Sequence, residues 1–134
     1  QKQALEECLK KGQSVFFFPE GTSTDGSSLK QFKSSLFEVC YCDFFKKSNL
    51  GSVQPLTIIY QSPVENDPSF YSFWREEETI FENIKKILKK VGHGRVRLIF
   101  HRPIEFNKYS NRKYLSFACF EKVRSGLAKS ARSS

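Results

Sequence analysis

The chain has 134 residues and a net charge of +8 at pH 7, and it is 39% hydrophobic and 15% aromatic. This composition excludes a disordered chain and, with 27% charged residues, an integral membrane protein. A chain of this length forms one domain, and no run approaches the roughly 20 apolar residues of a membrane-spanning helix. The basic excess favours a polyanionic partner: nucleic acid, an anionic membrane surface or an acidic carrier protein.

The first third of the chain predicts a helix, a strand and a second helix. Residues 4–11 have a helical pattern that stops at Gly12. Residues 15–18 are a short apolar run, typical of a strand buried on both faces of a parallel sheet. Ser35 and Glu38 have the spacing of a capping box, which predicts the start of a second helix.

The rest of the chain predicts two further strands and two further helices. Residues 53–60 are β-branched and apolar, and Pro55 should lie at the strand start, at an edge or in a bulge, because proline has no N–H to donate. Residues 61–75 are predicted to be a loop. From Glu76 a helix with an acidic first turn and a lysine-rich second half runs to Gly92. The last predicted strand and helix are residues 95–101 and 111–129.

This alternation predicts an α/β fold: a sheet of parallel or mixed strands, flanked by helices. Three strands are few for such a sheet, and the sequence has no methionine and starts within a helical pattern. We therefore expect residues 1–129 to be the C-terminal portion of a single domain whose N-terminal part is missing. Residues 130–134 are expected to be a disordered tail.

Two features leave alternatives open. The cysteines (Cys8, Cys40, Cys42 and Cys119) lack CxxC spacing and are predicted to be reduced core thiols, with a zinc site or a disulfide as the alternative. The helix after Glu76 carries lysines beside an apolar stripe. It is expected either to pack on the core, with its lysines at the negative end of its own dipole, or to rest on anionic lipid.

A polar loop, residues 19–33, follows the first predicted strand, at the strand end where open α/β sheets bind ligands. Gly21 lets backbone N–H groups approach a ligand, Thr22 offers a hydroxyl, and Lys33 can neutralise a phosphate. Glu20 can accept hydrogen bonds from ligand hydroxyls or orient a basic neighbour. The loop is either a site for a phosphorylated polyol or a hydrophilic turn whose hydroxyls bond to its own backbone.

The run VFFFPEGTSTDG, followed by FKSSLF, resembles the third signature block, FPEGT, of the 1-acyl-glycerol-3-phosphate acyltransferase family. VQPLTIIY resembles that family's fourth block, a short strand built around a proline. The chain is most similar to bacterial members with FPEGTSSDG, which include acyltransferases of phosphatidic acid and ornithine-lipid synthesis. The resemblance implies that residues 1–129 are the C-terminal portion of a glycerolipid acyltransferase domain.

The resemblance also implies a reaction, without cofactor or metal. A fatty acyl group passes from acyl carrier protein or coenzyme A to the hydroxyl of a lysolipid, such as 1-acyl-glycerol-3-phosphate or a lyso-ornithine lipid. The protein would be peripheral, on the cytoplasmic face of a bacterial inner membrane. The implied substrate-binding residues are Pro19, Glu20, Gly21, Thr22 and Ser23, with Lys33 as a phosphate contact and Pro55 shaping the acyl or acceptor pocket. The family's usual arginine after EGT is Ser23 here, which removes a bidentate phosphate partner.

The family's first block, a histidine and an aspartate five positions apart, is absent from the chain. The residue five positions after His93 is Leu98, and the one after His101 is Phe106. In the family that histidine is the general base that takes the proton of the acceptor hydroxyl. The arginine-bearing second block is absent too. We therefore assign no catalytic residue within the chain and expect the chain alone to be inactive, with the dyad upstream of Gln1.

The alternative function is a non-catalytic basic module that binds nucleic acid or anionic lipid. The sequence contains no aromatic-basic RNA-binding motif, so a nucleic-acid partner is not expected.

Overall fold

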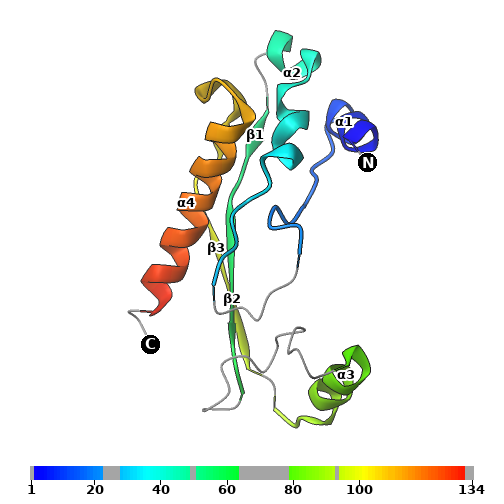
Figure 1. Cartoon of the computed structure of the whole chain (residues 1–134), viewed down its shortest axis with the longest axis vertical. Coiled ribbons are helices and arrows are strands. Elements are labelled where there is room, and N and C mark those ends of the chain that lie inside the picture. Colours follow the sequence, from blue (N-terminus) through cyan, green and yellow to red (C-terminus); the bar gives the residue numbers. More distant parts are fainter. Residues whose placement is uncertain (1, 23–27, 49–50, 64–78, 93, 132–134) are drawn as a thin grey trace.

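The computed structural model describes residues 2–22, 28–48, 51–63, 79–92 and 94–131 (Figure 1). The helices are α1 (Lys2–Lys10), α2 (Asp43–Ser48), α3 (Ile80–Lys89) and α4 (Arg112–Ala131), with 3-10 helices η1 (Ser34–Tyr41) and η2 (Phe106–Lys108). The strands are β1 (Ser52–Val53), β2 (Leu56–Gln61), β3 (Arg95–Phe100) and β4 (Ile104–Glu105).

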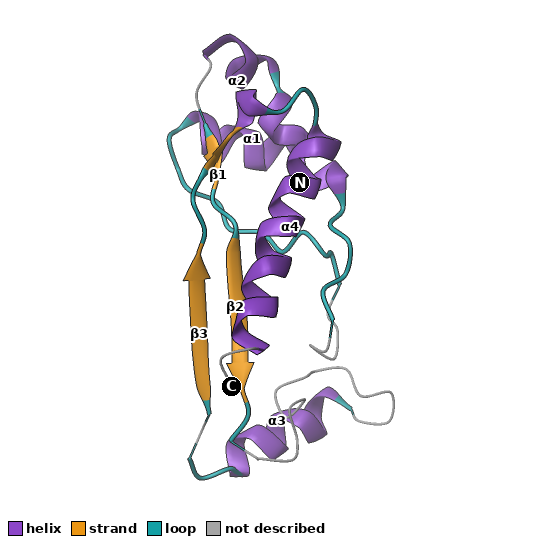
Figure 2. Cartoon of the chain, turned by 90° about the vertical axis from the view of Figure 1, so that its left-hand side faces the viewer, coloured by secondary structure: helices purple, strands orange, loops and turns teal. Residues whose placement is uncertain are grey.

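The described strands form two antiparallel pairs. β2 pairs with β3, from Leu56 opposite Phe100 to Gln61 opposite Arg95, and β1 pairs with β4. The expectation of parallel strands is therefore wrong for this part of the chain. A parallel pair needs a connection that crosses over the sheet, whereas α3 lies beyond the end of the β2–β3 pair and the chain turns back there (Figure 2).

The strand predicted over residues 15–18 is not formed. The segment has no regular secondary structure, although its side chains alternate as in a strand: Phe17 packs edge-on against Phe37, with ring centroids 5.3 Å apart. Phe16 and Phe18 point the other way and are 83% and 77% exposed. A strand is defined by its ladder of hydrogen bonds, and no described strand pairs with this segment.

The second helix also differs from its prediction. The capping box of Ser35 and Glu38 is not formed, because residues 34–41 are a 3-10 helix preceded by Lys33, which makes no side-chain cap. The Glu38 carboxylate instead accepts a hydrogen bond from Arg112 of α4, at 2.6 Å. A contact 74 residues away in sequence thus replaces the local cap. The α-helix begins only at Asp43.

Other elements are confirmed, with shifted ends. The predicted first and last helices are α1 and α4; Gly12 follows α1 with φ 75°, and the Asn111 side chain accepts the backbone N–H groups of Lys113 and Tyr114. The strand predicted over residues 53–60 is divided at Pro55 into β1 and β2. Residues 64–75 of the predicted loop and residues 76–78 of the predicted helix lie outside the described residues.

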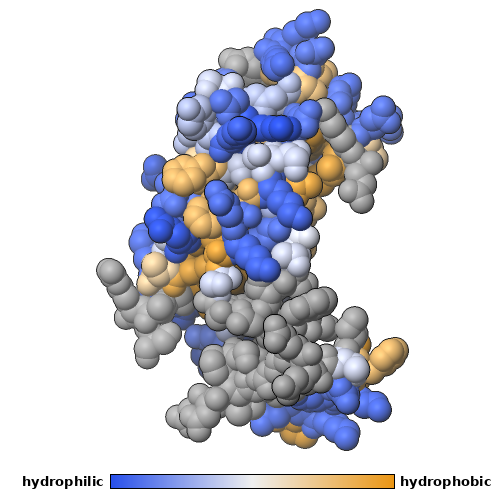
Figure 3. Space-filling model, in the orientation of Figure 1, coloured by the Kyte–Doolittle hydropathy of each residue, from blue (hydrophilic) through white to orange (hydrophobic). Residues whose placement is uncertain are grey.

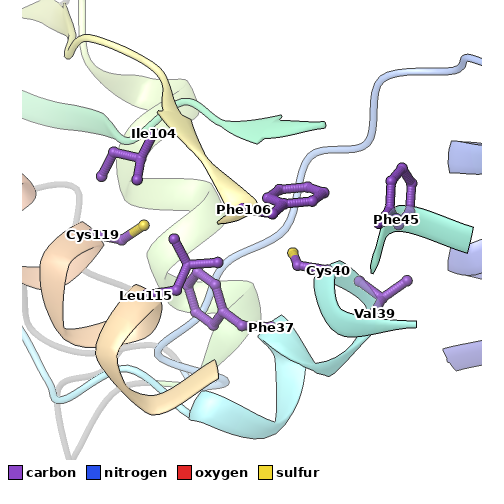
Figure 4. Packing of buried hydrophobic residues seen from close by; sticks show 8 residues of the cluster. All are labelled: Phe37, Val39, Cys40, Phe45, Ile104, Phe106, Leu115 and Cys119. Carbon is purple, nitrogen blue, oxygen red and sulfur yellow. The ribbon is translucent and has the colours of Figure 1, made fainter. Parts of the chain in front are cut away.

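The core lies where α4 packs against η1 and the β1–β4 pair approaches them (Figure 4). Phe45 and Phe106 meet edge-to-face at 5.3 Å, and Leu115 is fully buried. The four cysteines are free thiols; Cys40 and Cys119 lie in this core, and burial raises the pKa of each to about 12. Both side chains are therefore neutral thiols at physiological pH. Cys8 and Cys42 are half-buried.

Candidate functional site: the turn after residue 18

The candidate site is a β-turn formed by Phe18, Pro19, Glu20 and Gly21. The Gly21 N–H donates to the Phe18 carbonyl at 3.2 Å, which closes the turn. Proline at the second position has its φ already set for such a turn. Gly21 has φ 66°, in the left-handed region that glycine adopts without steric cost. The local sequence PEG therefore determines this bend.

Two hydrogen bonds fasten the returning segment to this turn. The Lys33 N–H donates to the Pro19 carbonyl, and the Lys30 N–H donates to Oε2 of Glu20, both at 2.8 Å. Glu20 is half-buried, and its bond to the Lys30 amide links residues that lie ten positions apart in the sequence. The carboxylate thus holds together the two sides of a loop whose residues 23–27 lie outside the described part of the chain.

Lys33 lies across Gly21. A Cβ atom at Gly21 would stand 2.8 Å from both Cδ and Nζ of Lys33, which is closer than side chains approach. The absence of a side chain at Gly21 therefore lets an ammonium group rest against the backbone of an exposed turn. Thr22 is also exposed. A cation beside a glycine turn and a hydroxyl is an arrangement that attracts an anionic group.

The remaining predicted site residues lie apart from this cluster. Ser23 lies outside the described residues. Pro55 is buried between β1 and β2, where its carbonyl accepts the His101 N–H at 3.0 Å. The structure thus brings together Pro19, Glu20, Gly21 and Lys33, whereas Pro55 is held by the strands.

A shallow hollow of about 200 Å³ lies next to the segment that carries Lys33. Phe32 reaches it from that segment and meets Phe120 of α4 edge-to-face, with ring centroids 5.5 Å apart. Phe117 and Lys113, also on α4, complete much of its wall. The hollow combines three aromatic rings with three uncharged polar side chains and one cation, and its lining includes the residues on both sides of Lys33.

His101 directly follows β3, at the end of the predicted strand, but the sequence did not indicate the partner of its side chain. The fully buried Thr57 hydroxyl donates to the Val123 carbonyl at 3.1 Å, so His101 Nε2, 2.8 Å away, donates to Thr57 Oγ1. Burial, and then the charges of nearby lysines, lower the pKa of His101, so the ring is neutral at pH 7. Gly126 makes room for this arrangement, since a Cβ there would stand 2.5 Å from Thr57 Oγ1. A glycine inside a helical pattern was the one available signal.

The comparisons with known proteins agree with the FPEGT motif. Residues 1–59 match the family model described as Acyltransferase. The chain is 36% identical over 132 residues to a lyso-ornithine lipid O-acyltransferase of Rhodobacter capsulatus, covering 98% of this chain and 47% of that protein. It is 34% identical over 111 residues to a chloroplastic 1-acyl-sn-glycerol-3-phosphate acyltransferase of Arabidopsis thaliana, covering 81% and 24%. The chain is therefore similar to the acyltransferase family, over residues 1–59 by the family model and over nearly its whole length by the Rhodobacter capsulatus protein.

A second bacterial relative extends this result. A lyso-ornithine lipid O-acyltransferase of Rhizobium meliloti is 28% identical over 126 residues, which cover 90% of this chain and 42% of that protein. The chain spans less than half the length of these relatives. No solved structure matches it significantly. Among the residues that the structure describes, no helix has the length and apolar character of a membrane span.

Proposed function

We propose that the chain is the acceptor-binding, C-terminal part of an acyltransferase that moves a fatty acyl group from acyl carrier protein or coenzyme A to the hydroxyl of a lysolipid at a membrane surface. The observation that carries the proposal is the turn of Glu20 and Gly21 with Lys33 lying across it. It stands in the FPEGT motif of a chain whose relatives are named as lysolipid acyltransferases.

In this proposal the turn binds the headgroup of the acceptor. Lys33 neutralises an anionic group, and the Thr22 hydroxyl lies one residue beyond Gly21 to hydrogen-bond it. Glu20 acts by holding the loop closed through the Lys30 N–H. The anionic group is a phosphate in 1-acyl-glycerol-3-phosphate and a carboxylate in a lyso-ornithine lipid. Ser23, which replaces an arginine, leaves one cation fewer for a doubly charged phosphate.

The catalytic base is proposed to come from residues N-terminal to Gln1 in the complete protein. Acyl transfer needs a base within hydrogen-bond reach of the acceptor hydroxyl, oriented by a third group. His101 does not meet this requirement, because its Nε2–H is donated to Thr57 at the interface of α4 and β2. Phe16 and Phe18, both largely exposed beside the turn, are a surface on which such an N-terminal part can pack.

The test compares the chain with a version extended upstream of Gln1. Each is assayed with labelled acyl carrier protein and acyl-coenzyme A, and with 1-acyl-glycerol-3-phosphate and a lyso-ornithine lipid as acceptors. We expect turnover by the extended protein only. Turnover by the short chain would overturn the proposal that the base lies elsewhere, and no turnover by the extended protein with any combination would overturn the proposed activity.

A further inference from the structure

Helix α3 carries an apolar stripe that faces outward. Successive residues turn by about 100° on a helix, so Phe81, Ile84, Lys85 and Leu88 lie along one side. Phe81 and Leu88 are each 77% exposed, and Ile84 is 40% exposed. The rest of the helix is more covered, since Lys86 and Ile87 are half-buried. The expectation that this helix packs on the core is therefore wrong for the side that carries Phe81 and Leu88.

No other described helix or strand packs extensively against α3. It lies beyond the end of the β2–β3 pair, at the far end of the molecule from α1 and α2 (Figures 1 and 2). In Figure 3 hydrophobic and hydrophilic residues lie side by side at this end. Val91, which follows the helix, is 94% exposed and extends the apolar surface past its C-terminus.

Basic side chains border the stripe. Lys85 and Lys89 are exposed and lie on the flank next to Phe81 and Leu88. The one acidic residue of α3, Glu82, forms a capping box with Thr79: the Thr79 N–H donates to its carboxylate at 2.8 Å, and the Glu82 N–H donates to the Thr79 hydroxyl. The Thr79 N–H and hydroxyl, which both donate to the Glu82 carboxylate, lower the pKa of Glu82 and keep its charge at the helix start. The outward flank is therefore cationic.

We propose that α3 is the element by which the protein docks on a membrane surface that contains anionic lipids. Phe81, Leu88 and Val91 enter the boundary between headgroups and acyl chains, and Lys85 and Lys89 contact lipid phosphates. Charge complementarity favours this occupant: an apolar stripe bordered by lysines fits a surface that is apolar inside and negative outside. A protein groove would cover the stripe but leave both lysines to find acidic partners.

A helix of 10 residues is marginal in water without tertiary packing, so a surface that covers its apolar side also stabilises it. The inference deepens the proposed function, because a lysolipid acceptor resides in a bilayer. It predicts that docking depends on α3 and that acceptor binding depends on the separate turn at Gly21. The two are measured independently, since vesicles lacking any lysolipid report docking alone.

The test is flotation of the chain with two kinds of vesicle: phosphatidylcholine alone, and phosphatidylcholine with about one-third phosphatidylglycerol. The double variant Phe81→Ala, Leu88→Ala should bind the anionic vesicles at least about tenfold more weakly. The matched control, Tyr114→Ala with Phe117→Ala, removes similarly exposed rings from α4 and should change binding less than twofold. All four side chains are at least half exposed, so the variants should keep the fold.

A second pair of variants tests the charge. Lys85→Gln with Lys89→Gln should weaken binding about tenfold or more on anionic vesicles and hardly at all on neutral ones. The control, Lys46→Gln with Lys47→Gln, makes the same change in net charge on α2, at the other end of the molecule, and should have a smaller effect. Equal losses in the two pairs would overturn the inference in favour of a general charge effect.

A spectroscopic measurement completes the test. In a Phe81→Trp variant, the fluorescence of residue 81 should shift to shorter wavelength when anionic vesicles are added, because the ring leaves water. A wild-type chain that does not float with either vesicle would overturn the inference while leaving the acyltransferase assay unaffected. Conversely, flotation that depends on α3 in a protein without acyl transfer would support docking and contradict only the proposed activity.

Discussion

Gly126 is predicted to be a position where adding one methyl group destabilises the fold. Gly126→Ala places a Cβ atom 2.5 Å from Thr57 Oγ1, 3.0 Å from Thr57 Cβ and 3.1 Å from His101 Nε2. Thr57 is completely buried in β2 and cannot move away. α4 must therefore shift outward, and the bonds from His101 to Thr57 and from Thr57 to the Val123 carbonyl lengthen.

The expected fall in the free energy of unfolding is the balance of opposing effects. Overpacking a buried contact costs about 1–3 kcal/mol, and each weakened hydrogen bond costs up to roughly 1 kcal/mol. Alanine is a better helix former than glycine by about 1 kcal/mol, which offsets part of this. We expect the free energy of unfolding to fall by about 2–3 kcal/mol, measured by urea unfolding followed by circular dichroism.

Ser125→Ala is the control, because Ser125 is the exposed neighbour on the same helix and its hydroxyl donates to the carbonyl of Lys122, one turn earlier. Its unfolding free energy should change by less than about 0.5 kcal/mol. Combining Gly126→Ala with Thr57→Ala should cost less than the sum of the single changes, because the two share one contact. If Gly126→Ala stabilised the protein by the helix-propensity difference alone, the close packing of α4 on β2 would be refuted.

Two further predictions concern titration and thiol chemistry. Because burial lowers the pKa of folded His101 below its ordinary value of 6.5, the unfolded chain takes up the proton first. The contribution of His101 to stability is therefore full above pH 6.5 and is lost as the pH falls below that value, and His101→Gln should remove this dependence. Iodoacetamide at pH 8 should label the two half-buried cysteines of the native protein and spare Cys40 and Cys119, whose pKa is about 12. Mass spectrometry checks the labelling, and early modification of Cys40 would contradict the described core.

Local signals in the sequence predicted most helices but not the way in which the strands pair. α1 and α4 followed from apolar periodicity and from stop signals that are read within a few residues. The prediction of a strand at residues 15–18 was wrong because a strand requires a second strand to pair with. Periodicity in the sequence cannot show whether such a partner is present. The prediction of a capping box at Ser35 and Glu38 was wrong because Glu38 forms an ion pair with Arg112, and this contact exists only in the folded chain.

The candidate site could be predicted in part, since PEG is a turn sequence and FPEGT is a family motif. The position of Lys33 across Gly21 depends on the return of residues 28–33, which the bond from Lys30 to Glu20 fastens. Sequence spacing gave no sign of that bond. The role of His101 could not be predicted either, because its partner Thr57 lies 44 residues away on a paired strand.

The most direct test of the proposed headgroup site is the Michaelis constant for the lysolipid acceptor, measured in the protein extended upstream of Gln1. Lys33→Met removes the ammonium group that lies on Gly21, whereas Lys30→Met removes the same charge three residues earlier and keeps the backbone N–H that bonds Glu20. We predict that Lys33→Met raises the constant about tenfold or more with kcat nearly unchanged, and that Lys30→Met changes it less than twofold. Equal effects of the two substitutions, or none from Lys33→Met, would contradict a headgroup site at this turn.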